Sequence, residues 1–223
     1  MIFDPLHVNR AERLQAMAAS LGPSVLSDVE ILELHLARSG HREAGSLAHD
    51  LIARFGGFCA VLAADQSQLH LAVGELAAMD LKLLREAARR VTRADLAQRQ
   101  LLTSFSQVAD YLRALMAGLP REEFWVLFLD RRNQLLSAER LGVGSVDHAP
   151  VYPREVMRRA LELNCSAMIL AHNHPSGDPQ PSQPDIEMTK TLIEAGKALQ
   201  IQIHDHMIVA GGAVVSFRAN GLI

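Results

Sequence analysis

The stretch 172–185 constrains this chain more than any other part of its sequence. It reads His-Asn-His-Pro-Ser-Gly-Asp-Pro-Gln-Pro-Ser-Gln-Pro-Asp, follows the apolar run 167–171, and leads into a helical pattern. Alternate residues of a strand point to the same side, about 6–7 Å apart along the chain, so His172 and His174 can direct their imidazoles at one ion. The stretch therefore predicts a metal site where a buried strand ends and a helix begins.

Asp185 is the natural third ligand of such a site. Zinc favours histidine nitrogen and carboxylate oxygen, and catalytic zinc sites use three protein ligands with one position open for water. A structural explanation competes, because Ser182, Pro184 and Asp185 also have the order of a helix N-terminus, with serine as the N-cap and an acid at the third position. Paired histidines at a strand end together with an acid at a helix start favour the metal, and we predict a single zinc ion per chain.

The charge distribution excludes a general affinity for polyanions. The formal net charge is -3; residues 1–100 hold 11 Lys and Arg against 12 Asp and Glu, and the remainder holds 11 against 13. Neither half has the excess of positive charge that attracts nucleic acid.

We expect a cytoplasmic protein. Cys59 and Cys165 each lie in an apolar context, which predicts two buried free thiols in a reducing compartment rather than a disulfide. The N-terminus has no signal-peptide pattern, and no apolar run is long enough to span a bilayer. A membrane partner is therefore not expected.

Residues 9–100 have the pattern of successive short helices. Ser27 and Glu30 have the spacing of a capping box, and the pair Gly56 and Gly57 provides a helix stop. The expected helices are 12–19, 31–36, 43–55, 58–64, 66–73 and 78–91. Two short helices, a glycine turn and a longer helix suggest a helix-hairpin-helix, whose turn can hold a DNA phosphate.

This hairpin is degenerate. Its turn reads Gly74-Glu75-Leu76, so Leu76 stands where DNA-binding hairpins have a second glycine, and Glu75 would repel a phosphate. Leucine also disfavours the left-handed conformation that glycine tolerates. A purely structural helical bundle is the competing interpretation.

The C-terminal half predicts an α+β fold. The apolar run 124–129 is too short for a typical helix and indicates a buried strand. The expected helices are 107–116, one that begins at Pro153, and 185–199; the expected strands are 124–129, 135–141, 143–147, 166–171, 201–209 and 213–217. These elements predict a mainly antiparallel sheet with flanking helices in a domain 102–223, which follows an all-helical domain 1–101.

Hydrolysis at a zinc site also needs a general base. This must be a carboxylate that hydrogen-bonds the attacking water without ligating the metal. Four residues remain candidates for this base: Glu122, Glu123, Glu139 and Glu155. Ser182 can cap the helix and also offer its hydroxyl to a developing oxyanion.

The spacing His-x-His, seven residues, Ser-x-x-Asp resembles the signature of JAMM (MPN-plus) metalloprotease domains. The fuller sequence motif His-Asn-His-Pro-Ser-Gly-Asp-Pro-x-Pro-Ser-x-x-Asp is similar to that of the bacterial RadC family. The resemblance covers nearly the whole chain, since it extends to segments 22–28, 55–57, 153–155, 159–164 and 205–206.

The resemblance implies a helical N-terminal domain followed by a JAMM domain that binds zinc through His172, His174 and Asp185. Ser182 would stabilise the tetrahedral intermediate. JAMM enzymes elsewhere cut isopeptide bonds to ubiquitin-like proteins, and the RadC family is named for DNA repair.

The resemblance also implies a general base. JAMM domains carry their catalytic glutamate in an acid-Glu-Phe setting at the start of the first strand. The sequence Glu122-Glu123-Phe124 matches that setting, so Glu123 is the implied base, with Glu139 in reserve.

Two residues depart from the family pattern. Leu76 replaces the hairpin glycine, and Tyr152 stands where many relatives have histidine before Pro-Arg-Glu. His204 and His206 flank Asp205, which suggests a second metal; we expect instead that Asp205 or His206 supports the site or the fold.

Three functions compete. The first is a zinc hydrolase that cuts an amide or isopeptide bond in a peptide or protein substrate. The second is a DNA-associated repair or recombination module with a structural or vestigial zinc site, and the third is an interaction scaffold like the inactive MPN domains. The complete ligand set and a candidate base favour the hydrolase, because a structural zinc site is normally closed by a fourth protein ligand and scaffold domains typically lose the ligands.

Overall fold

The computed structural model describes residues 10–98, 105–144 and 151–223. The chain divides into two compact units, residues 1–85 and 86–223, which are described separately. This division falls within helix α5 (Gln66–Gln98). The expected domain boundary at residues 101 and 102 lies outside the described residues and stays a prediction.

The first unit is helical in its described part, as predicted. Its core is built from apolar side chains of α2, α3, α4 and α5, among them Leu32, Leu36, Leu51, Val61 and Leu69. The capping box predicted at Ser27 and Glu30 is present at the start of α2. The elements are α1 (Arg10–Leu21), a short 3-10 helix η2 (Pro23–Val25), α2 (Asp28–Arg38), α3 (Ala44–Phe55), α4 (Phe58–Ala63) and the first part of α5.

The predicted glycine turn is present inside α5. Gly74 has φ 75° and ψ 173°, which interrupts the helical backbone, and Leu76 is 65% exposed. DNA binding by this turn stays a prediction. The expectation that Cys59 is buried is wrong: its side chain is exposed, because α4 turns Val61 and Leu62 inward and a residue two positions away lies on another side of the helix.

The second unit contains a five-stranded sheet in the order β2-β1-β3-β4-β5. Three of the strand pairs are antiparallel, and β3 and β4 are parallel. This confirms the predicted α+β fold with a mainly antiparallel sheet. The elements are α6 (Phe105–Met116), β1 (Glu123–Leu129), β2 (Leu135–Val143), α7 (Pro153–Glu162), β3 (Ala167–His174), α8 (Gln183–Ala198), β4 (Gln202–Ala210) and β5 (Ala213–Ser216).

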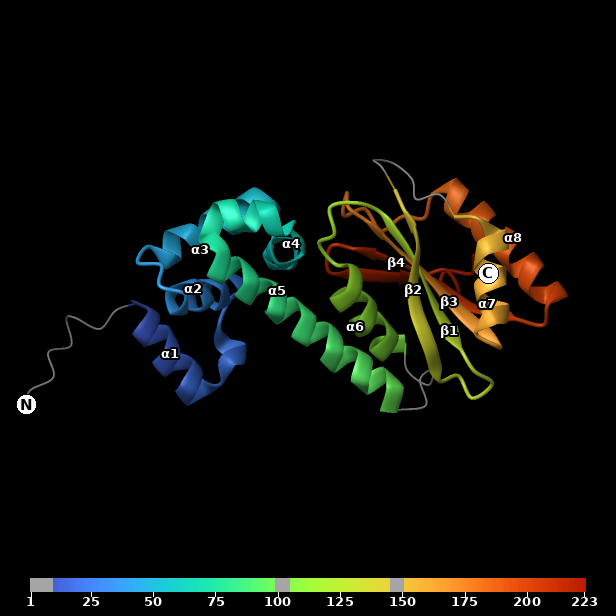
Figure 1. Cartoon of the computed structure of the whole chain (residues 1–223), viewed down its shortest axis with the longest axis horizontal. Coiled ribbons are helices and arrows are strands. Elements are labelled where there is room, and N and C mark those ends of the chain that lie inside the picture. Colours follow the sequence, from blue (N-terminus) through green and yellow to red (C-terminus); the bar gives the residue numbers. More distant parts are fainter. Residues whose placement is uncertain (1–9, 99–104, 145–150) are drawn as a thin grey trace, which may run out of the picture. The chain divides into compact units, whose positions relative to one another are not determined.

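Helices cover both faces of this sheet (Figure 1). On one face α6 packs on a cluster that includes Leu127, Ile169 and Val209. On the other face α7 and α8 pack on a cluster that includes Val126 and Leu170. The central strands β1 and β3 are therefore buried on both sides, which explains why each reads as a continuous apolar run.

One strand prediction needs correction. Of the expected strand 143–147, Val143 is the last residue of β2, and Gly144 lies outside any strand. Residues 145–147 lie outside the described residues. The return strand β2 is thus longer than predicted, because its pairing with β1 extends to Glu123 opposite Val143.

Helix α8 ends close to the start of β4, and Gly196 permits this approach. The backbone N–H of Ile201 donates to the carbonyl of Gly196 at 2.9 Å. A Cβ atom at position 196 would lie only 2.5 Å from the carbonyl oxygen of Ile201. Any side chain here must therefore push the end of α8 away from β4.

We predict that Gly196→Ala lowers the free energy of unfolding by about 1–3 kcal/mol, as forced overpacking does. The matched control is Gly212→Ala, because a Cβ at Gly212 meets nothing within 4 Å and should change stability by no more than about 0.5 kcal/mol. Urea denaturation of both variants measures the difference. Equal stability of the two variants would contradict the close contact at Gly196.

Candidate metal centre

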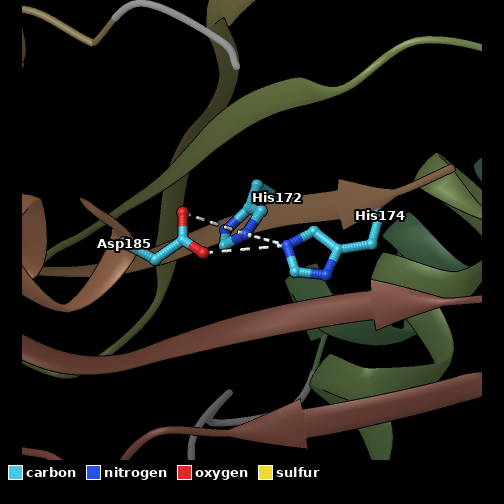
Figure 2. A group of neighbouring side chains, drawn as sticks. All are labelled: His172, His174 and Asp185. Atoms are coloured by element: carbon cyan, nitrogen blue, oxygen red, sulfur yellow. Dashed lines mark hydrogen bonds and ion pairs between the residues drawn. The ribbon is translucent and has the colours of Figure 1, made fainter. Parts of the chain in front are cut away.

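The end of β3 and the first turn of α8 bring three side chains together. The ligand atoms of His172, His174 and Asp185 all lie within 4.8 Å of one another (Figure 2). The two imidazole Nε2 atoms are 2.9 Å apart. Asp185 Oδ1 lies 3.4 Å from Nε2 of His172, and Oδ2 lies 3.7 Å from Nε2 of His174.

This donor set fits a metal ion. Nδ1 of His174 contacts the backbone carbonyl of Asp178 at 2.7 Å, and Nδ1 of His172 contacts Nε2 of His206 at 2.8 Å. Both Nε2 atoms are therefore the ones turned toward the carboxylate. Two ring nitrogens that face each other at 2.9 Å need a proton or a cation between them, because an unprotonated ring nitrogen can only accept.

The helix start that competed with the metal in the sequence is also present. Oδ2 of Asp185 accepts hydrogen bonds from the backbone N–H of Ser182 at 2.8 Å and from its hydroxyl at 2.6 Å. The backbone N–H of Asp185 in turn donates to Ser182 Oγ at 3.3 Å. The capping box thus holds Oδ2 and leaves Oδ1 directed at His172, so one carboxylate serves both the helix and the ligand cluster.

The electrostatics of the cluster favour a cation. Burial alone would raise the pKa of Asp185, but its contacts with the imidazoles of His172 and His174 outweigh burial and hold that pKa far below its usual value. The carboxylate is therefore ionised although the residue is only 8% exposed. Its hydrogen bond to His174 raises the pKa of that imidazole, so protons and a metal compete for the same nitrogen.

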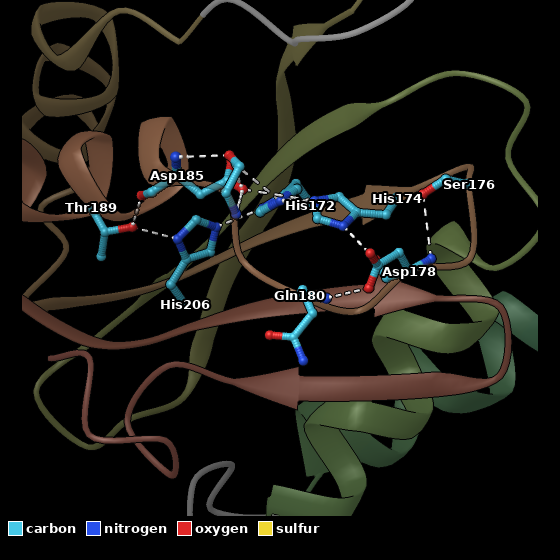
Figure 3. Close-up of polar contacts among 9 residues, drawn as sticks. His172, His174, Ser176, Asp178, Gln180, Asp185, Thr189 and His206 are labelled. Carbon is cyan, nitrogen blue, oxygen red and sulfur yellow. Dashed lines mark hydrogen bonds and ion pairs between the residues drawn. The ribbon is translucent and has the colours of Figure 1, made fainter.

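A second set of buried polar groups lies behind His172 (Figure 3). Nδ1 of His206, on β4, is 2.6 Å from the hydroxyl of Thr189 on α8, and that hydroxyl donates to the backbone carbonyl of Asp185 at 2.6 Å. His206 is 1% exposed, and burial lowers its pKa well below the ordinary value. The imidazole of His206 is therefore neutral at physiological pH.

The neighbouring residues of β4 do not form a second metal site. Asp205 accepts hydrogen bonds from the Ser216 hydroxyl at 2.5 Å and from the backbone N–H of Arg218 at 3.0 Å, so it ties β4 to the C-terminal turn. His204 Nε2 contacts Asn133 Oδ1 at 2.9 Å. Within the described parts of the chain, the cluster at His172 is the one group of three or more His, Cys, Asp or Glu side chains placed to hold a metal.

The loop between the ligands is held by its own polar groups (Figure 3). The backbone N–H of Asp178 donates to Ser176 Oγ at 3.3 Å, and that of Gln180 donates to Asp178 Oδ1 at 3.0 Å. Gly177 has φ 81°, a conformation that glycine adopts without strain. These turns let an irregular segment fix the distance from His174 to the helix start.

The structure does not bring the carboxylate of Glu123 to this cluster. Glu123 accepts from the indole N–H of Trp125 at 2.9 Å and from the Arg140 guanidinium at 2.7 Å. Trp125 packs on the cluster under α6, whereas Phe124 belongs to the cluster under α7 and α8. Since strand side chains alternate between faces, Glu123 lies on the α6 side, and His172, paired with Phe124, lies on the other.

The neighbouring acid, Glu122, lies immediately before β1. Glu122 precedes Phe124 by two residues, and its negative charge contributes to the raised pKa of His174. The backbone on both sides of Glu122 is fixed by the amide of Asn173, which accepts from the N–H of Glu123 at 2.8 Å and donates to the carbonyl of Arg121 at 2.9 Å. The residue between the two histidines therefore positions Glu122.

The two remaining candidate bases are held by arginines. The carboxylate of Glu139 accepts from Arg159 Nε and Nη2, each at 2.7 Å. The hydrogen bond from Arg159 lowers the pKa of Glu139, which weakens it as a base. Glu155 is paired with Arg158 at 2.9 Å, and this bond lowers its pKa in the same way.

Comparison with known proteins agrees with this geometry. A family model described as "RadC-like JAB domain" matches residues 102–222. A UPF0758 protein of Rhodobacter capsulatus is 47% identical over 205 residues, which cover 91% of this chain and 96% of the relative. A UPF0758 protein of Ruegeria pomeroyi is 46% identical over 215 residues, which cover 95% of this chain and 96% of the relative.

The sheet, its flanking helices and the His-His-Asp cluster are thus those of a JAB-type (MPN) domain. The chain belongs to the RadC family, as the motif predicted. The names of these two relatives state no activity. In the described part of the chain, no helix combines the length and the apolar character that a membrane span requires.

The sequence predicted the three side chains that converge here but did not point to Thr189. Its position four residues after Asp185 places it on the same side of α8, one turn further along. The spacing was a usable signal, since a threonine in a helix can bond the carbonyl four residues back. We expected only that Asp205 or His206 supports the site or the fold. The contact of His206 with His172 could not be derived from spacing.

We predict that the protein binds about one zinc ion per chain and that His174→Ala loses most of it. Zinc should raise the melting temperature of the wild type, because a ligand that binds only the folded state stabilises it. His70→Ala is the control, since His70 is an exposed histidine of α5. Metal analysis after dialysis and thermal unfolding measure both effects.

Wild-type protein that retains no metal after dialysis against trace zinc, and melts at the same temperature with and without it, would contradict the metal site. Equal zinc loss in His174→Ala and His70→Ala would show that binding is nonspecific.

Proposed function

We propose that this protein is a zinc-dependent hydrolase that cuts an amide or isopeptide bond in a peptide or protein substrate. One observation carries the proposal: the donors of His172, His174 and Asp185 converge, and among the residues that the structure describes this group has three members. Three protein ligands leave a coordination position for water or substrate, whereas structural zinc sites usually have four. The membership of the chain in a JAB-type family supports the same conclusion.

The metal is proposed to be zinc because of the ligand chemistry. Two imidazoles and one carboxylate are a ligand set that catalytic zinc sites use. Bound there, zinc acts as a Lewis acid and lowers the pKa of a water molecule to about 7. The remaining chemistry falls to side chains of this chain.

Glu122 is the general base in this proposal. It lies immediately before β1, two residues from Phe124, and its negative charge contributes to the raised pKa of His174. Its carboxylate would accept a proton from the attacking water and deliver it to the leaving amine, a role that requires hydrogen-bond reach without metal ligation. Glu123, which the family resemblance implied, is the alternative, and its bonds to Trp125 and Arg140 count against it.

Ser182 is proposed to stabilise the oxyanion. Its hydroxyl donates to Asp185 Oδ2 at 2.6 Å, so it lies beside the ligand cluster. A hydroxyl there can turn its proton toward a negative charge that develops on the substrate carbonyl. The capping function of Ser182 keeps the hydroxyl in place before substrate binds.

A cytoplasmic location belongs to the same proposal. It is supported by the two free cysteines, of which Cys59 is exposed, because an exposed free thiol persists best in a reducing compartment.

We predict that Glu122→Gln lowers the hydrolytic rate by at least about 100-fold, the usual contribution of a general base, while zinc content stays unchanged. Glu123→Gln should keep both zinc and most of the activity. The assay incubates each zinc-loaded protein with a denatured bacterial protein extract and counts new amino termini and freed lysine side chains by mass spectrometry.

The two variants separate the alternatives. Loss of activity in Glu123→Gln with activity kept in Glu122→Gln would assign the base to Glu123. A wild-type protein that binds zinc and cuts nothing in the extract, with the metal-free protein as its blank, would contradict the hydrolase.

We further predict different outcomes at the two capping boxes of the chain. Ser182→Ala and Ser27→Ala each remove an N-cap hydroxyl and should each lower stability by about 1 kcal/mol. Only Ser182→Ala should also lower the hydrolytic rate, by about 100-fold or more for a lost oxyanion donor. Denaturation and the extract assay on both variants test this. Equal activity of the two variants would exclude Ser182 from the chemistry.

A further inference from the structure

The polar contacts behind His172 form a hydrogen-bond chain with a fixed direction. This hydrogen-bond chain runs from His172 to His206, then to Thr189, and ends at the backbone carbonyl of Asp185. The three separations are 2.8, 2.6 and 2.6 Å. The side chains come from β3, β4 and α8. None of the three is more than 1% exposed, so bulk water does not compete for these bonds.

The carbonyl at the end sets the direction. A carbonyl oxygen can only accept, so the single hydroxyl proton of Thr189 points at Asp185. The oxygen of Thr189 must then accept from His206, which places the proton of His206 on Nδ1. A neutral imidazole carries one N–H, so Nε2 of His206 is the acceptor for His172.

The surroundings of His206 keep its ring neutral. The ring of Phe217 lies 4.5 Å from it and that of Phe124 lies 5.7 Å from it, centroid to centroid. An imidazolium between two phenyl rings, away from solvent, would lose its hydration, and the partners of the two ring nitrogens of His206 are an imidazole and a hydroxyl, not a carboxylate. Both nitrogens of His206 are already engaged, one as donor and one as acceptor.

We propose that His206, oriented by Thr189, is a positioning residue that holds His172 in the tautomer with the proton on Nδ1. That tautomer leaves Nε2 bare and turned toward His174 and Asp185. The functional role of this tautomer, which is to present Nε2 of His172 to a metal, rests on the proposed metal site. The tautomer itself is a property of the metal-free chain.

The two ligand histidines are therefore oriented by different means. His174 donates from Nδ1 to the carbonyl of Asp178 at 2.7 Å, a bond inside the loop that follows it. His172 points into the core, where no backbone carbonyl receives its Nδ1 and a side chain of β4 does so instead. Outer groups of this kind fix the tautomer and typically change metal affinity 10- to 100-fold.

The first experiment reads the tautomer directly. Long-range ¹H–¹⁵N spectra of the metal-free full chain distinguish the two ring nitrogens of each histidine, and the signals of His172 are assigned from their loss in His172→Gln. We expect a protonated Nδ1 and a bare Nε2. A protonated Nε2 on His172 in the wild type would overturn the proposal, whatever the protein does with zinc.

The second experiment measures zinc affinity by chelator competition at constant pH. Thr189→Val removes the hydroxyl at nearly constant volume and should weaken zinc binding by about 10- to 100-fold, with His172 changing tautomer or becoming a mixture. Thr189→Ser should restore wild-type affinity. Unchanged affinity and unchanged tautomer in Thr189→Val would overturn the role of the hydroxyl.

The chain offers a matched control on the same helix. Thr191 bonds the carbonyl four residues back, that of Glu187, at 2.9 Å, as Thr189 bonds that of Asp185, but Thr191 is exposed and has no contact with His206. Thr191→Val should leave zinc affinity and the His172 signals unchanged. An equal loss in both variants would mean that helix perturbation, not the hydrogen-bond chain, is responsible.

Failure of the proposed function gives a different result. A wild type that binds no zinc contradicts the metal site and the hydrolase, while the spectra of the metal-free protein still decide the tautomer of His172.

Discussion

The ionised carboxylate of Asp185 is the group on which the site depends. A charge that is almost removed from water is tolerated only where hydrogen bonds and opposite charge replace its hydration. Ser182 donates twice to Oδ2, and the two imidazoles lie on the other side. The start of α8 and the ligand cluster therefore stabilise the same anion, so the helix cannot lose its cap without disturbing the ligands.

The fold was largely predictable because each element carries its own pattern. The strands β1 and β3 contain continuous apolar runs. The starts of α2 and α8 are marked by a serine with an acid three residues later. Errors arose where a residue's environment depends on packing. The exposure of Cys59 follows from the side that α4 turns to its core, and the extent of β2 follows from its pairing with β1.

The convergence of His172, His174 and Asp185 was predictable for a different reason: strand periodicity and helix capping place all three within one short segment. The base that we propose was not, because Glu122 and Glu123 are adjacent and a shift of one residue moves a side chain to the opposite face of the sheet. Only the pairing of β1 with β3 and the bonds of Glu123 to Trp125 and Arg140 distinguish them. The contact of His206 with His172 joins different strands, and no local pattern encodes it.

The parallel pairing of β3 and β4 across α8 has a consequence for how the site assembles. The clustered side chains His172, His174 and Asp185, the serine cap, Thr189 and His206 all lie within residues 172–206, a single β-α-β crossover, whereas Glu122 lies just before β1, about fifty residues earlier in the chain. Closing a short loop costs less conformational entropy than closing a long one. The geometry of the cluster can thus form as one local folding unit, and the docking of β1 adds Glu122, the base that we propose.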